Sequence, residues 1–337
     1  MADWLTGVAP MNRDAVSRTG PGYTHRQYMR RHPGNSRAKG KSRRGSAACG
    51  NSGSPMIDAE KLLKTEIPEI RQSVSKRDAI LYALSVGLGQ DPLDERQLDF
   101  VDHHRDLAAV PSMAVVLGHP GFWLGRDDSG VDPKSVLHGE QQIELLRPLP
   151  VDGQVIGRTR IAGLIDKGVG GAALLLTEKR IVDAATDDLL AVTRSTTFLR
   201  GGGGFGGSPG PLPPVHAVPE RAPDMIVDLA TRPEQALLYR LNGDDNSLHA
   251  DPAVALHAGF PRPILHGLCS FGVACHALLR ALADYRPDRL RRMSLRFSAP
   301  VFPGETIRTE IWRDGSFRAR VVERDAVVLN NGFVEFT

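Results

Sequence analysis

The sequence predicts an α+β protein built from two similar halves, and three observations lead to this fold class. Most patterned segments alternate apolar and polar residues, as strands with one covered face do. Helical spacing is confined to a few segments. In each half, a strand precedes a helix and several antiparallel strands follow.

The first half begins with a helix signal. Ser75 and Asp78 have the spacing of a capping box, apolar residues at helical spacing follow, and Gly87 and Gly89 end the pattern. A second, short helix is predicted over residues 111–117. The predicted strands of this half occupy residues 141–146, 155–164, 172–181 and 189–199.

Residues 201–224 are rich in Gly and Pro, and we interpret them as a linker. The alternative is a loop that binds phosphate. Neither a following Lys-Ser/Thr pair nor a helix start supports that alternative.

The second half repeats the order of the first. A strand is predicted over 235–241, an irregular segment runs to Leu265, and a long helix is predicted over 267–283. The remaining predicted strands occupy residues 290–297, 305–312, 316–323 and 326–336.

A short sequence echo supports an internal duplication. Residues 145–156 and 297–307 each combine a strand, prolines, a Gly turn and a second strand, about 150 residues apart. Together with the repeated element order, this predicts an N-terminal domain over residues 56–200 and a C-terminal domain over 225–337.

Residues 1–55 differ in composition from the rest of the chain. They hold ten basic and two acidic residues, a net charge of +8, whereas the remainder holds 32 basic and 37 acidic residues. With few aliphatic residues, they are predicted to form a disordered basic tail, with Met56 as an alternative natural start and a transit peptide as another interpretation. Because the rest of the chain is acidic, nucleic-acid binding is not expected of it.

The cysteines and the apolar runs bear on the compartment. The chain has three cysteines (Cys49, Cys269 and Cys275), with no Cys-x-x-Cys pair, so neither a disulfide framework nor a structural zinc site is expected. No run approaches eighteen apolar residues, so no membrane span is expected. These features favour a cytoplasmic protein.

The densest polar cluster places Asp244, Asn246 and His249 within six residues, after Gly243. Such residues are common in loops that carry function, and they are also ordinary turn formers. A metal site formed by Asp244, Asp245 and His249 is a third interpretation.

Several motifs resemble one family. Gly243-Asp-Asp-Asn-Ser-Leu-His249 resembles the hydratase 2 motif, Gly-Asp-x-Asn-Pro-x-His, of MaoC-like (R)-specific 2-enoyl-CoA hydratases, with Ser247 where the family has proline. Residues 264–268 resemble the start of the family's central helix, and 297–306 its late strand and turn. Segments of the first half resemble the non-catalytic half of two-domain members, such as the hydratase part of peroxisomal multifunctional enzyme type 2: residues 77–84, 110–113 and 137–141.

The resemblance, which covers residues 57–337, implies a double hot-dog fold: two hot-dog repeats, each a long helix wrapped by an antiparallel sheet. It also implies hydration of trans-2-enoyl-CoA to (3R)-hydroxyacyl-CoA. Asp244 and His249 would be the catalytic pair, Asn246 would help to fix their geometry, and the Gly267 N–H would form the oxyanion hole. An acyl-CoA thioester is the implied substrate, no cofactor or metal is expected, and a homodimer is implied.

Other functions on the same fold remain open. They are a (3R)-hydroxyacyl carrier protein dehydratase, an acyl-CoA thioesterase and a non-catalytic acyl-CoA-binding subunit.

Among the other residues, His266 could line the site or make a structural hydrogen bond, and His138 and Glu140 are interpreted as structural. Ser270 is interpreted as a helix-packing residue, and three arginines could meet CoA phosphates: Arg291, Arg292 and Arg296.

Overall fold

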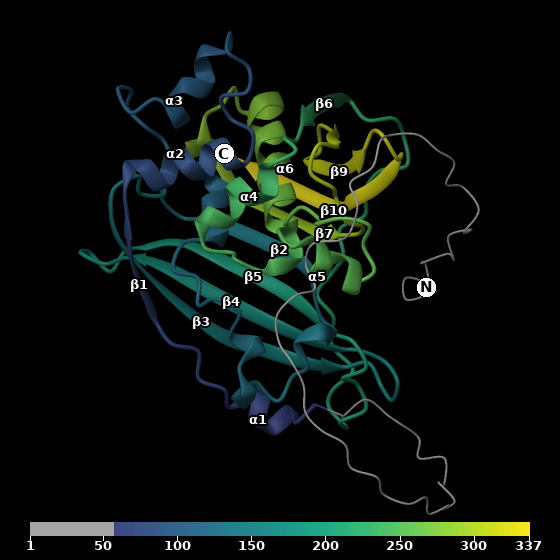
Figure 1. The fold of residues 1–337 in the computed structure, drawn as a ribbon. Helices are drawn as coiled ribbons and strands as arrows, with labels where there is room; N and C mark the ends of the chain where they lie inside the picture. Colours follow the sequence, from purple (N-terminus) through teal and green to yellow (C-terminus); the bar gives the residue numbers. More distant parts are fainter. Residues whose placement is uncertain (1–56) are drawn as a thin grey trace, which may run out of the picture. The chain divides into compact units, whose positions relative to one another are not determined.

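The structure, a computed structural model, describes residues 57–337. Within this range, ten strands form one sheet in which every neighbouring pair is antiparallel (Figure 1). The strands are β1 (Ile70–Val74), β2 (Val136–Leu145), β3 (Gly153–Asp166), β4 (Ala173–Asp183), β5 (Leu189–Leu199), β6 (Met225–Ala230), β7 (Leu290–Phe297), β8 (Thr306–Ile311), β9 (Ser316–Val321) and β10 (Ala326–Phe336).

The helices of the described residues are mostly short. The α-helices are α1 (Ala59–Leu63), α2 (Lys76–Ser85), α3 (Leu98–Val101), α4 (Gln235–Tyr239), α5 (Pro252–His257) and α6 (Gly267–Leu282). The 3-10 helices are η1 (Glu95–Gln97), η2 (Pro111–Val115), η3 (Trp123–Gly125), η4 (Asp127–Ser129), η5 (Pro133–Ser135), η6 (Arg240–Asn242), η7 (Ser247–His249) and η8 (Pro287–Arg289).

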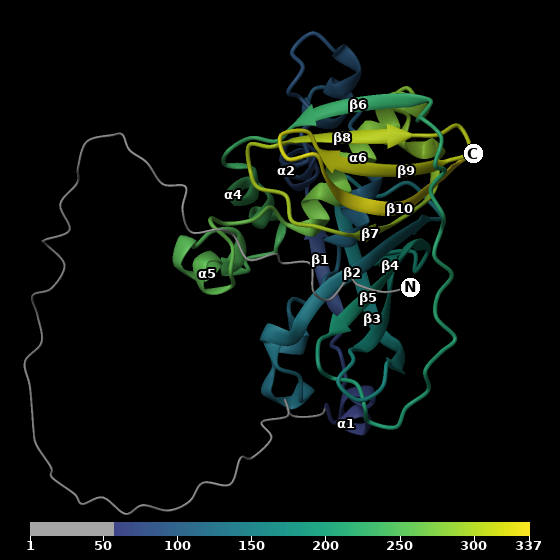
Figure 2. The same ribbon diagram turned by 90° about the vertical axis from the view of Figure 1, so that its right-hand side faces the viewer.

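The strand order shows the duplication directly. It runs β1-β3-β4-β5-β2 and then β7-β10-β9-β8-β6, so each half mirrors the other around the β2–β7 pair. Figure 2 shows the second half's strands in succession, with β2 next to β7. Register at the join places Gln141 opposite Leu295 and Ile143 opposite Met293. This is the predicted double hot-dog arrangement, joined into one continuous sheet.

The halves differ in their helices. In the second half, the 16-residue α6 contacts β6, β7, β8 and β10 and is buried along most of its length. The first half has instead the 10-residue α2 and the five-residue η2. The Ser75–Asp78 capping box is formed, and Gly87 follows α2 with φ of 92°. After η2, Gly118 approaches Gly157 so closely that a Cβ atom on Gly118 would lie 2.6 Å from the Gly157 backbone, so this position requires glycine.

One predicted strand is wrong. Residues 235–241 form α4 and then η6, and the strand that opens the second half is β6 instead. The short apolar run from Ala236 to Tyr239 fits both the two-residue period of a strand and the 3.6-residue period of a helix. Periodicity alone cannot separate a strand from a buried helical turn of this length. Three other predicted strands, 189–199, 290–297 and 326–336, have the bounds of β5, β7 and β10.

The Gly-rich segment after β5 is held by a carboxylate rather than built around a phosphate. Asp166 accepts backbone hydrogen bonds from Gly168 at 2.8 Å, Gly204 at 2.6 Å, Gly206 at 2.8 Å and Gly207 at 3.2 Å. These bonds, led by the one from Gly204, lower the pKa of Asp166. The start of the predicted linker is therefore fastened to the first half.

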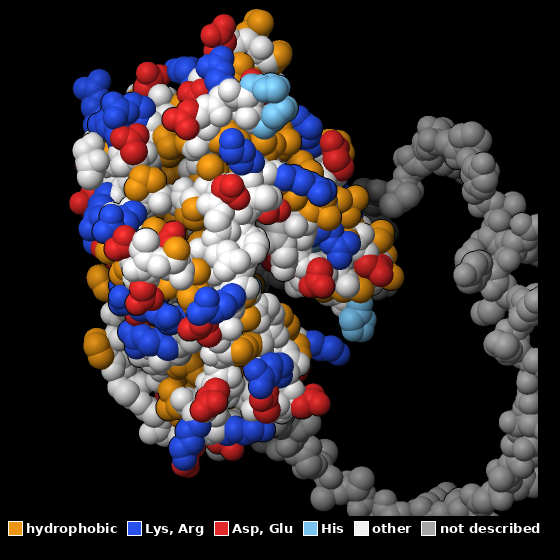
Figure 3. Space-filling model, turned by 90° about the vertical axis from the view of Figure 1, so that its left-hand side faces the viewer, with side chains coloured by type: hydrophobic (Ala, Val, Ile, Leu, Met, Phe, Trp, Pro, Cys, Tyr) orange, Lys and Arg blue, Asp and Glu red, His pale blue; other side chains and the backbone are white. Residues whose placement is uncertain are grey.

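The predicted disordered tail, residues 1–55, lies outside the described residues. Cys269 and Cys275 are buried and free, as expected for small core residues. None of the helices in residues 57–337 combines the length and apolar character that a membrane crossing requires. On the face in Figure 3, basic and acidic side chains lie interspersed.

Candidate active site

The polar loop of the second half is shaped by its own residues. Gly243, with φ of 106°, turns the chain after η6. The side chain of Asn246 then accepts a hydrogen bond from the Leu248 N–H at 3.0 Å and opens η7, which ends at His249. Asn246 therefore shapes the loop locally, and the turn brings Asp244 and His249 to the same side of it.

Three potential proton-transfer groups gather here. A carboxylate oxygen of Asp244 and one ring nitrogen each of His249 and His266 lie within 4.8 Å of one another. His249 is 9% exposed and His266 is 1% exposed. The metal interpretation of the sequence combined Asp244 and His249 with Asp245; the structure gathers His266 with them instead. His266 lies 17 residues after His249 in sequence, and this position fits the interpretation that it could line the site.

The His249 ring has a defined tautomer. Its Nδ1 lies 2.9 Å from the main-chain oxygen of Ile264, and because a carbonyl only accepts, Nδ1 carries the hydrogen. Its Nε2 therefore has a free lone pair. Burial lowers the pKa of His249, while the Ile264 carbonyl and the Asp244 charge oppose this shift. The ring is thus a neutral proton acceptor at neutral pH.

The N-terminus of α6 borders this cluster. Gly267 is the first residue of the helix and follows His266, which provides no side-chain cap. Within residues 57–337, the Gly267 N–H donates to no acceptor. A Cβ atom at this position would lie 3.3 Å from the Phe297 ring, so a side chain here would crowd that ring. Such a donor suits an oxygen that gains negative charge.

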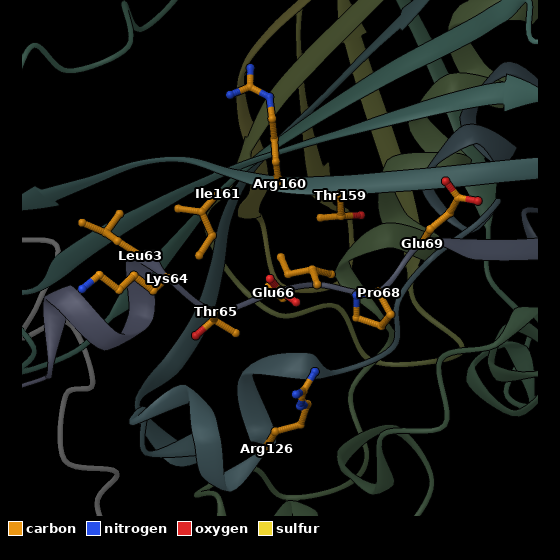
Figure 4. Close-up of a pocket in the computed structure, with 11 residues that line it drawn as sticks. Leu63, Lys64, Thr65, Glu66, Pro68, Glu69, Arg126, Thr159, Arg160 and Ile161 are labelled. Carbon is orange, nitrogen blue, oxygen red and sulfur yellow. The ribbon is translucent and has the colours of Figure 1, made fainter.

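A hollow of about 160 Å³ reaches His249. Its other lining residues are largely apolar: Pro233, Ala236, Leu237, Ala250, Arg262, Pro263 and Pro303. A larger hollow of about 790 Å³ lies against β3 in the first half (Figure 4). Charged residues of that hollow are engaged with one another or with neighbours, such as Arg160 with Glu178 and Lys64 with Glu60. The smaller hollow is the candidate active site because His249 lines it, and a carboxylate oxygen of Asp244 lies within 4.8 Å of a His249 ring nitrogen.

Comparisons with known proteins agree with this location. Residues 214–332 match a MaoC like domain, and residues 73–201 match an MFE-2 hydratase 2 N-terminal domain. The chain is 40% identical over 297 residues to the peroxisomal enoyl-CoA hydratase 2 of Arabidopsis thaliana, across 83% of this chain and 95% of that protein. The chain belongs to the MaoC-like hydratase 2 family.

Two further relatives extend the comparison. The 3-hydroxyacyl-thioester dehydratase Y of Mycobacterium tuberculosis is 41% identical over 269 residues, 77% of this chain and 92% of that protein. A solved MaoC-like dehydratase from Phytophthora capsici has a TM-score of 0.74 at 34% identity, and the match covers 83% of this chain and 98% of that one. As a MaoC-like hydratase 2, the chain is a hydro-lyase. Because one relative is named peroxisomal, the cytoplasmic location stays a prediction.

In this hydratase 2 chain, the first half lies close to the loop that carries Asp244 and His249. The Asp244 charge acts on His138 of β2, although burial is the main cause that lowers the His138 pKa to about 4. His138 also contacts Phe297 edge to face, with ring centroids 4.9 Å apart. The interpretation of His138 as structural fits these contacts. The pairing of β2 with β7 joins the two halves here, so the proximity of His138 to the loop could not be predicted from local sequence.

The remaining predicted groups have structural partners. Glu140 pairs with Arg296 at 2.6 Å, and Ser270 is buried with its hydroxyl near the His266 carbonyl. Arg291 donates to the Leu145 carbonyl, and Arg292 lies near Glu144. Because these arginines serve the β2–β7 junction, their role in binding CoA stays a prediction.

Proposed function

We propose that this chain reversibly hydrates trans-2-enoyl-CoA to (3R)-hydroxyacyl-CoA, with Asp244 and His249 as the acid–base pair. The observation that carries the proposal is their juxtaposition beside the N-terminus of α6. Asp244 contributes a carboxylate and His249 a ring nitrogen with a free lone pair. Both are hydrogen-bond acceptors, so together they suit a single water molecule, which has two hydrogens to donate.

The reaction then requires the transfer of one proton from the water to the α-carbon. The water oxygen attacks the β-carbon of the enoyl thioester while the pair takes one of its protons. The electrons of the double bond pass to the α-carbon and the thioester oxygen. The pair returns a proton to the α-carbon, so that water is added and Asp244 and His249 regain their starting states.

The thioester oxygen gains negative charge during this step. We assign the Gly267 N–H as its hydrogen-bond donor, because this N–H lacks an acceptor within residues 57–337 and stands at the positive end of α6. Asn246 keeps the role of shaping the loop that carries the pair.

One side-by-side assay tests the proposal. Crotonyl-CoA, a long-chain enoyl-CoA and the matching acyl carrier protein substrates are compared, with the chirality of the product determined and free CoA thiol monitored. Formation of the (3R)-hydroxyacyl-CoA without thiol release is expected. Thiol release would favour the thioesterase, and binding without turnover would favour a non-catalytic subunit.

A second candidate is dehydration of a (3R)-hydroxyacyl carrier protein thioester. The similarity to a protein named 3-hydroxyacyl-thioester dehydratase favours keeping it, because dehydration is the same chemistry in reverse. A much higher kcat/KM with the carrier protein substrates in the assay above would establish it over the CoA reaction.

We also propose that the chain forms a homodimer. In the described residues, β1 and β6 are the terminal strands of the sheet, and open edges favour pairing. The side chain of Ile226 on β6 is exposed. Sedimentation at micromolar concentration is expected to give twice the 36.6 kDa chain mass, and a monomer alone would contradict the proposal.

A further inference from the structure

His266 ties the catalytic loop to the start of α6. Its Nε2 lies 3.2 Å from the main-chain oxygen of Asp244, so Nε2 carries the hydrogen and donates it. The same residue is the N-cap of α6, directly before Gly267. One side chain therefore connects the residue that bears the proposed carboxylate to the helix that bears the proposed oxyanion donor.

His266 also packs against the imidazole of His249. The two rings are stacked, with centroids 3.8 Å apart and planes inclined by 28°. The Tyr239 ring contacts His266 in turn, at 5.0 Å. His249 is thus held twice by the segment before α6: by the Ile264 carbonyl at Nδ1 and by the His266 ring against its face.

The unused nitrogen of His266 argues against a purely space-filling role. Nδ1 is buried and has no hydrogen-bond partner within the described residues. An unpaired buried acceptor is unfavourable for folding, and such groups are expected where they serve another purpose. A phenylalanine would fill the space without this cost, but it could not donate to the Asp244 carbonyl.

We propose that His266 is a positioning residue that fixes both members of the acid–base pair, holding Asp244 through its main-chain carbonyl and His249 through ring stacking. This inference rests on the proposed hydration by Asp244 and His249. The other charged or titratable groups around the two rings are Arg240, Tyr239 and, from the first half, His119 and His138 near Asp244.

Two substitutions separate the two contacts. His266→Phe keeps an aromatic ring for stacking and loses the donor, whereas His266→Gln keeps a donor and loses the ring. We expect each to lower kcat roughly three- to tenfold with little change in KM, as the loss of one hydrogen bond or contact to a positioned group does. His266→Ala, which loses both contacts, should lower kcat further than either.

His276 offers a matched control on the same helix. It is as buried as His266 and bonds to the Tyr285 hydroxyl at 3.0 Å, away from the catalytic loop. His276→Gln is expected to lower Tm and to leave kcat unchanged. If it lowers kcat as much as the His266 variants do, the effect belongs to α6 as a whole and the proposal is overturned.

The contact between His266 and His249 can also be measured directly, without an assay of turnover. The His249 ring is titrated by NMR in protein with isotope-labelled histidine. Burial by His266 helps to keep the pKa of His249 low, so His266→Ala should raise the titration midpoint toward the ordinary value of 6.5, and His276→Gln should not. If His266→Ala does not fold, His266→Gln gives the same readout with a smaller rise.

The outcomes separate this inference from the proposed function. An unchanged His249 midpoint, or kcat within about twofold of wild type in both His266→Phe and His266→Gln, overturns the positioning role. If Asp244→Asn stays fully active, the acid–base assignment fails instead, and the NMR titration still reports whether His266 holds His249.

Discussion

The two halves of the sheet have the same topology but use their polar residues differently. In the first half, two buried polar side chains have partners within the protein: Lys179 donates to the carbonyls of Val115 and Leu117, and Asp166 accepts four glycine N–H groups. In the second half, His266 Nδ1 and the Gly267 N–H lack partners within residues 57–337. The two named groups of the first half are therefore occupied by the protein itself, whereas the two of the second half stay available.

The helix starts show the same contrast. In the first half, η2 begins at Pro111, and in the second half, α6 begins at Gly267. Proline has no N–H, so the first residue of η2 has no backbone donor, whereas the first residue of α6 has one. The difference teaches that two halves with the same strand order can differ in the donor that a helix start provides.

The largest expected effect comes from the acid–base pair. Asp244→Asn and His249→Gln should each lower kcat by at least about 100-fold, because each removes a proton-transfer group. The double variant should be little worse than the poorer single variant, because both residues act on one water. Steady-state kinetics measures this, with Tm confirming folded protein. If both single variants keep more than about a tenth of the activity, the loop only forms a turn.

The helix starts can be made alike by Gly267→Pro. His266 has φ of −57° and ψ of 135°, which suits a residue before proline, and proline is tolerated at the first helical position. Loss of the N–H should lower kcat about 100- to 1,000-fold.

Gly267→Ala is the control for that substitution, because it adds a Cβ near Phe297 and keeps the N–H. It should lose much less activity than the proline variant. Equal losses in both would mean that crowding, rather than the missing donor, explains the result.

The pH profile of kcat/KM should report His249 of the second half, because kcat/KM follows the groups of the free enzyme. Burial lowers its folded pKa below 6.5, and the proposed reaction needs the neutral ring. Activity should therefore persist at pH 6.5 and fall as the pH drops through the lowered pKa. In the first half, His138→Gln should leave the acid limb in place. An acid limb above pH 6.5 would contradict the assigned environment of His249.

The smallest effect is expected from Asp166 of the first half. Asp166→Asn removes a charge that accepts four N–H groups, so it should lower Tm by a few degrees at pH 7 and leave kcat unchanged. The folded pKa of Asp166 is depressed, so its stabilisation is present above the unfolded pKa and is lost as pH falls through the folded pKa. Thermal unfolding should show the two proteins converging at acidic pH. A constant gap would refute the charge-based explanation.

The sequence by itself determined the local elements and the motif residues. The Ser75–Asp78 cap, the bounds of β5, β7 and β10 and the long helix after His266 all depend on neighbours within a few residues, and so they could be predicted. The family resemblance supplied the candidate catalytic residues Asp244 and His249 and the candidate oxyanion-hole residue Gly267.

Only the tertiary structure decided the rest. The mirrored strand order places β2 beside β7. The stacking of His266 on His249 and the bonds from Gly204 and Gly206 to Asp166 join residues 17 or more positions apart. The helix at residues 235–239 was likewise set by its burial rather than by its short apolar run. Local patterns record which face of an element is apolar, but they do not record which distant side chain that face will meet.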